Sequence, residues 1–169
     1  MGQFSKLAIP ISLDEYDLRS MSRQERWDTC KEILQNEPDE ALRWDAVWLV
    51  GELAEEAGPD DPIFEKAADL IAWVLKHDKN SIVKHEACYQ IAARKMHQKI
   101  PDLTESALND ESGLVAHEAI ESLGLLNAFD SDDLISSSIQ SQNQDVRQTA
   151  EFVLKRLTRV KNKNLLNYF

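Results

Sequence analysis

Glycine, proline and cysteine are scarce in this sequence of 169 residues, which holds five glycines, five prolines and two cysteines. The glycines and prolines fall mostly between apolar stretches of helical period. No stretch alternates apolar and polar residues for long enough to indicate a strand. Since residues that favour helices dominate the remainder, the sequence predicts an all-α protein.

Cysteine pairs and long apolar runs are missing as well. Cys30 and Cys88 are too few for a disulfide framework, and we interpret them as buried thiols in a reducing compartment. No run approaches the roughly 20 apolar residues of a membrane-spanning helix. The first residues, MGQFSKLAIPI, lack the apolar stretch of a signal peptide. The sequence therefore predicts a cytoplasmic protein that does not contact a membrane.

Basic residues are the minority among the charged ones. The chain has 19 lysines and arginines against 30 aspartates and glutamates, which gives a net charge of -11. A nucleic-acid partner requires a basic surface that displaces counterions from phosphates, so this balance argues against one. The acidic charge suits a cationic partner or substrate.

The sequence does contain an internal repeat. Four segments align on an anchor residue that stands two positions before a shared alanine. The anchors are Trp44, His85, His117 and Gln148, and the alanines are Ala46, Ala87, Ala119 and Ala150. A helix N-cap residue stands five positions before each anchor, and an apolar residue stands six positions after it. Anchors about 30 to 40 residues apart are typical of a helical repeat array.

The periodicity predicts four helical hairpins that stack into an α-α superhelix. The predicted helices cover about residues 22–36, 39–57, 62–76, 80–97, 101–108, 112–126, 131 onward and 143–159, with a short helix near 13–19. We expect a repeat domain over 22–159, an N-terminal extension over 1–21 and a C-terminal tail over 160–169. The tail is basic and then apolar, and we interpret it as a frayed end, with a docking strap for a second subunit as the alternative.

Two adjacent residue pairs carry the chemistry. His85-Glu86 and His117-Glu118 occupy the same register of the second and third repeats. Neighbouring helices lie about 8–10 Å apart, and an imidazole reaches a metal over a bond of about 2.1 Å, so both histidines can reach one ion. The adjacent glutamates can ligate that ion or bridge to a second one. Imidazole and carboxylate donors with open positions suit ferrous iron, and we interpret all four residues as metal ligands.

Other interpretations of these side chains stay open. A solvated face is the main alternative, because glutamate near a helix start is stabilising without any function. A structural zinc site is weaker, because such sites favour cysteine ligands. Tyr89 either supports His85 or packs as an ordinary core aromatic. Glu121 and Asp45 add negative charge to the same face, whereas His77 and His97 lie off the motif.

The repeated pattern resembles HEAT-like repeats over about residues 23–158. In such repeats the two residues before the shared alanine face solvent on the concave side. The His-Glu pairs at these positions resemble those of the deoxyhypusine hydroxylase family. That resemblance implies a dinuclear non-haem iron enzyme with Fe(II) held by His85, Glu86, His117 and Glu118, and a substrate derived from a lysine side chain of a translation factor.

The resemblance also implies an oligomer. Members of that family carry four His-Glu motifs in two halves, and this chain has two, so it resembles one half. A two-fold homodimer would assemble four pairs and hold two irons per dimer. Without a dimer, one chain could hold a single metal. The alternative function is a HEAT-repeat scaffold without catalysis, which binds a partner protein on its concave face.

Overall fold

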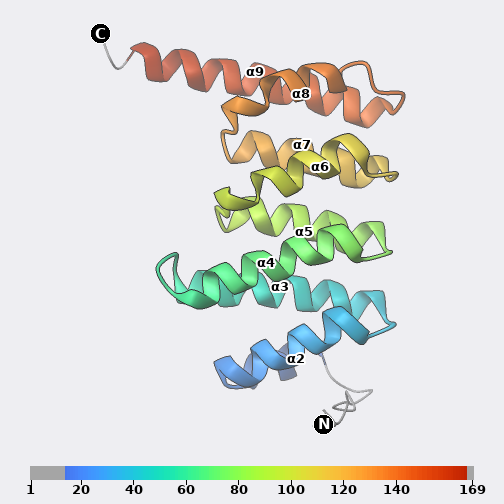
Figure 1. The fold of residues 1–169 in the computed structure, drawn as a ribbon, viewed down its shortest axis with the longest axis vertical. Coiled ribbons are helices and arrows are strands. Elements are labelled where there is room, and N and C mark those ends of the chain that lie inside the picture. The colour runs from blue at the N-terminus through green and yellow to red at the C-terminus, as the bar shows by residue number, and fades with distance from the viewer. Residues whose placement is uncertain (1–13, 167–169) are drawn as a thin grey trace, which may run out of the picture.

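The computed structural model describes residues 14–166, which form helices joined by short turns (Figure 1). The helices are α1 (Glu15–Ser20), α2 (Arg23–Asn36), α3 (Glu40–Ala57), α4 (Pro62–His77), α5 (Ser81–Ala93), η1 (His97–Lys99), α6 (Ile100–Asn109), α7 (Gly113–Leu125), η2 (Phe129–Ser131), α8 (Asp132–Ser138) and α9 (Gln144–Leu166). The described range contains no strand, as the all-α prediction requires. Most of the predicted N-terminal extension, residues 1–13, lies outside the described range.

Four antiparallel hairpins stack in chain order, namely α2–α3, α4–α5, α6–α7 and α8–α9 (Figure 1). Helix α3 packs against α5, α5 against α7, and α7 against α9, so the second helices of the hairpins form one layer. The first helices pack on that layer as a second one. The structure thus confirms the predicted solenoid of four helical hairpins.

Side-chain caps begin most of the second helices where the repeat predicted them. The Asp39 carboxylate accepts hydrogen bonds from two amides of the first turn of α3, and the Asn80 side chain does the same for α5. Asn143 accepts from the amides of Asp145 and Val146 at the start of α9. Ser112 departs from the pattern, because its side chain makes no cap and its amide donates to the carboxylate of the preceding turn.

Two helix ends differ from the prediction. Helix α5 ends at Ala93 instead of near 97, because Lys95 takes a left-handed φ of 55° and the chain then turns inward to bury Met96 completely. An αL residue just past the last turn is a common helix terminator. Helix α9 was expected to end near 159, yet it continues to Leu166 and so includes most of the basic tail.

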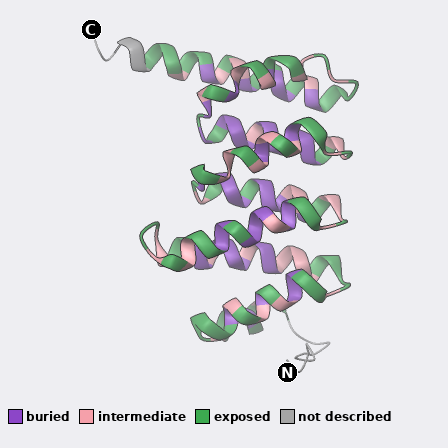
Figure 2. Cartoon of the chain, viewed as in Figure 1, coloured by how far each residue is buried: buried purple, intermediate pink, exposed green. Residues whose placement is uncertain are grey.

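The core runs along the interior between the two layers (Figure 2). The four alanines of the repeat are fully buried there. Their small side chains allow neighbouring second helices to approach closely, which brings equivalent positions of successive repeats within contact distance. Leu18 of α1 joins the same core, and none of the helices in the described range combines the length and apolarity that a bilayer crossing requires.

Candidate metal centre

Both His-Glu pairs lie in the N-terminal halves of α5 and α7, which pack directly against each other. His85 and His117 are partly exposed, with 33% and 30% of their side-chain surface accessible. Glu86 and Glu118 are buried. The expectation that both members of a pair face solvent is therefore wrong for the glutamates. One residue along a helix turns the side chain by about 100°. That rotation buries both glutamates, and it directs Glu118 toward α5, whereas Glu86 contacts Gln90 on its own helix.

A direct contact joins the two pairs. The His85 Nε2 atom on α5 lies 3.1 Å from Glu118 Oε2 on α7. This hydrogen bond raises the pKa of His85, because the Glu118 carboxylate stabilises the protonated ring, and the charges of Glu86 and Glu121 act in the same direction. The contact between His85 and Glu118 thus crosses the interface between the two helices that the sequence pattern predicted to be neighbours.

His117 has partners on both of its ring nitrogens. Its Nδ1 lies 2.5 Å from the hydroxyl oxygen of Thr149 on α9, and its Nε2 lies 3.6 Å from Glu121 Oε2. When Nδ1 carries the proton and donates to Thr149, Nε2 keeps the lone pair that a metal needs. Thr149 occupies the position that the glutamates hold in the second and third repeats.

Three donors on α7 converge. His117, Glu118 and Glu121 each offer one ligand atom, and these atoms all lie within 4.8 Å of one another. Bonds of about 2.0–2.2 Å to nitrogen and oxygen place opposite ligands of one ion about 4 Å apart, so small side-chain rotations suffice. One imidazole and two carboxylates with open positions fit a divalent ion such as Fe²⁺ or Mn²⁺.

Glu86 stands apart from the other three predicted ligands. One of its carboxylate oxygens accepts a hydrogen bond of 2.8 Å from Gln90 Nε2, and burial raises its pKa. Gln90 in turn accepts from Arg94. Among the described residues, Glu86 makes no ion pair with either His85 or His117.

Tyr89 and His77 have structural partners outside the His-Glu pairs. Tyr89 stacks on Trp48, with ring centroids 6.1 Å apart, which favours the packing interpretation. Burial raises the pKa of Asp45 in the first repeat. His77 stacks on Trp73 and contacts its carbonyl oxygen in the last turn of α4, and neither contact involves a His-Glu pair.

The sequence pattern alone indicates no metal role for Glu121 and does not distinguish Thr149. The signal for Glu121 was its spacing of four residues from His117, which places both on one helix face. The signal for Thr149 was its repeat register alone. Neither residue type stands out without the neighbouring helix in place.

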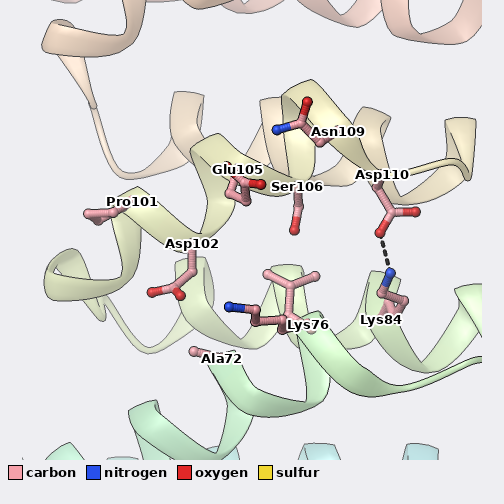
Figure 3. A pocket seen from close by; sticks show the side chains of 10 residues that line it. Ala72, Lys76, Lys84, Pro101, Asp102, Glu105, Ser106, Asn109 and Asp110 are labelled. Atoms are coloured by element: carbon pink, nitrogen blue, oxygen red, sulfur yellow. Dashed lines mark hydrogen bonds and ion pairs between the residues drawn. The ribbon is translucent and has the colours of Figure 1, made fainter.

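A separate cavity of about 310 Å³ lies between α4 and α6 (Figure 3). Lys76 and Asp102 face it from these two helices, and the Lys84–Asp110 ion pair closes one side. None of the His-Glu residues lines this cavity. It offers no imidazole, so it is distinct from the candidate metal centre.

Known proteins share this architecture. The family model of HEAT repeats matches residues 28–124 and 67–155 of the chain. The chain belongs to the HEAT-repeat family. It is 31% identical over 144 residues to a deoxyhypusine hydroxylase of Saccharomyces cerevisiae, and the matched region covers 79% of this chain and 44% of that protein. It is 34% identical over 92 residues to a deoxyhypusine hydroxylase of Arabidopsis thaliana, and the matched region covers 53% of this chain and 29% of that protein.

A solved structure shows the same fold. Human deoxyhypusine hydroxylase in complex with glycerol superposes with a TM-score of 0.70 at 21% identity, over 87% of this chain and 48% of that one. The chain thus spans about half the length of these relatives or less. The resemblance to one half of a deoxyhypusine hydroxylase, expected from the His-Glu pairs, is confirmed.

Proposed function

We propose that this chain is an iron-dependent hydroxylase of the deoxyhypusine hydroxylase type. The observation that carries the proposal is the contact of 3.1 Å between His85 and Glu118, which links two His-Glu pairs of equal register across adjacent helices. Relatives named deoxyhypusine hydroxylase in two fungi and a plant match this chain at 31–36% identity. Deoxyhypusine, a side chain derived from lysine, is accordingly the proposed substrate.

We assign His85, Glu86, His117 and Glu118 to the metal. Bound ferrous iron would supply oxygen activation at its open coordination positions. Thr149 would hold the His117 ring so that Nε2 faces the metal, and Gln90 would hold the Glu86 carboxylate. The buried carboxylates and the net charge of -11 favour a cationic substrate over an anionic one.

A second copy of the chain completes the proposed centre. Two copies related by a two-fold axis would present four His-Glu pairs and hold two irons per dimer. His85 and His117 keep 33% and 30% of their side-chain surface exposed, which leaves room for a partner's ligands beside them. We further propose a cytoplasmic location, because two free, buried thiols suit a reducing compartment.

Elemental analysis tests the metal assignment. Untagged protein, purified without chelators, should contain about one iron per chain, as a dinuclear centre shared by two copies requires. The His85→Ala and His117→Ala variants should lose it, whereas His77→Gln should retain it, because His77 lies outside the motif and contacts Trp73. Absence of stoichiometric metal after anaerobic ferrous reconstitution would contradict the proposal.

Two further measurements test the substrate and the dimer. The iron-loaded protein with a reductant and dioxygen should add one oxygen atom to a deoxyhypusine-containing protein, as mass spectrometry would show. Sedimentation analysis should find a dimer in the iron-loaded state. A monomer that holds two irons per chain would overturn the dimer.

A scaffold without catalysis is the second candidate function. The observation that favours it is a set of exposed apolar side chains on the second helices of the hairpins. These are Ile82, Tyr89, Leu114, Leu125 and Phe152. Such residues form contact surfaces for partner proteins. The double variant His85→Ala/His117→Ala separates the two functions, because a scaffold would keep its partner and a metalloenzyme would lose its iron.

A further inference from the structure

One position of the repeat changes character in the third unit only. The residue four places after the anchor is Trp48, Tyr89 and Phe152 in the first, second and fourth repeats, and it is Glu121 in the third. Residues four apart on a helix share a face. The aromatic residues and Glu121 therefore lie on the same side of the layer as the anchor histidines.

The fold places no demand for a carboxylate at this position. Trp48 and Tyr89 use it to stack across α3 and α5, and the Phe152 ring is 57% exposed. Glu121 is 44% exposed, and its one ion pair within the described residues is the contact with His117 Nε2 at 3.6 Å. An acidic side chain that replaces an aromatic one, and whose ion pair within the described part of the chain is with an imidazole, has the contacts of a ligand rather than those of a structural residue.

We propose that Glu121 is a further metal ligand, and that His117, Glu118 and Glu121 form a three-donor site for a divalent cation on α7 alone. This inference rests on the proposed function, because it extends the same centre. Its geometric basis is the convergence of the three ligand atoms within 4.8 Å. His117 contributes Nε2, because its Nδ1 is engaged by Thr149.

The two His-Glu pairs are then unequal. His85 has Tyr89 one turn further on, where no carboxylate is available, whereas His117 has Glu121. Two carboxylates and one imidazole from a single helix need no second copy of the chain. The α7 site should therefore fill first, and it should fill in a monomer.

Titration of the metal-free full-length chain with Mn²⁺ tests this assignment. Mn²⁺ accepts the same donors as Fe²⁺ and is stable in air, and electron paramagnetic resonance counts the free ion directly. The wild type should show one tight site. Glu121→Gln keeps the shape and removes the charge, and it should weaken that site by about tenfold or more, at least the loss that a supporting residue of a metal site causes. Glu151→Gln, an exposed glutamate on α9, is the matched control and should bind as the wild type does.

The outcomes separate this inference from the proposed function. If the wild type binds Mn²⁺ and Glu121→Gln binds it equally well, Glu121 is no ligand and the metal assignment of the His-Glu pairs still stands. If the wild type binds neither Mn²⁺ nor Fe²⁺, both proposals fail. Thermal unfolding of the metal-free variants should match the wild type, since Glu121 is half-exposed, so a loss of binding cannot come from misfolding.

Discussion

His85 on α5 contacts Glu118 on α7, with Nε2 and Oε2 3.1 Å apart. One repeat further, His117 on α7 contacts Thr149 on α9 at the equivalent position. The histidine of each pair thus reaches the second position of the next pair in the stack. Because these contacts join successive second helices, the candidate site forms only when the hairpins stack.

Glu118 lies near both histidines. It contacts His85 and belongs to the cluster with His117 and Glu121. Glu86 instead accepts a hydrogen bond from Gln90. The two glutamates occupy the same position of their repeats, yet they differ in their surroundings.

Glu118→Gln should weaken metal binding more than Glu86→Gln does. The first change removes a charged donor from the converging cluster, and we expect a loss of affinity of about tenfold or more. The second removes a carboxylate that is held by an amide, so its effect should be smaller. Mn²⁺ titration of both variants measures the difference, and equal losses would show that Glu86 approaches the ion as closely as Glu118.

Thr149→Val should lower metal affinity by about tenfold, the lower end of the effect of removing the partner of a ligating histidine. Valine has nearly the shape of threonine but cannot accept a hydrogen bond from the Nδ1–H group of His117. Thr149→Ser retains the hydroxyl and is the control that should bind nearly as the wild type does. The same titration measures all three proteins, and a Thr149→Val variant with unchanged affinity would show that the contact of 2.5 Å does not orient the ring.

The fold was largely predictable because its determinants are local. Caps such as Asp39 and Asn80 act on their own helix, and the buried alanines recur at fixed intervals. The end of α5 was not predictable, because the residues after Ala93 favour a helix and only the burial of Met96 requires the turn at Lys95.

The positions of the candidate ligands were predictable from the repeat register, but their contacts were not. Register placed His85 and His117 on one face and on neighbouring helices. The rotation of α5 relative to α7 decides that His85 contacts Glu118 while Glu86 turns toward Gln90. That rotation depends on how the whole interface packs, which no pattern within one helix encodes.

Gly124→Ala should destabilise the protein, although alanine favours a helix. A Cβ at Gly124 would lie 2.8 Å from a methyl carbon of Val153 on α9. Overpacking costs about 1–3 kcal/mol, which exceeds the gain of about 1 kcal/mol from helix propensity. Urea unfolding should therefore show a lower free energy of unfolding for the variant.

The Val153→Ala background provides the control for that change. With the valine methyl groups removed, Gly124→Ala should become neutral or stabilising, by up to about 1 kcal/mol. A double-mutant cycle measures this coupling. If Gly124→Ala costs the same in both backgrounds, the contact with Val153 does not limit the approach of α7 and α9.

The two cysteines should be protected from thiol reagents in the folded protein and should influence its alkaline stability. Burial raises the pKa of the Cys30 thiol to about 12 and raises that of Cys88 as well. The pKa of such a thiol is higher in the folded state than the unfolded value of about 8.5. Its contribution to the free energy of unfolding is therefore complete below about pH 8.5 and falls as the pH rises toward 12. An Ellman assay should find no fast thiol at pH 8 until urea is added.

The alkaline effect is best measured as a slope. Between about pH 9 and 11 a single such thiol lowers the free energy of unfolding by up to about 1.4 kcal/mol per pH unit. Lysines and tyrosines titrate in the same range, but they are common to the wild type and to Cys30→Ala. The difference between the slopes of the two proteins therefore isolates the Cys30 thiol, even though the alanine variant starts from a lower stability because of its cavity. Parallel slopes would show that Cys30 ionises without unfolding and that water reaches its thiol in the native state.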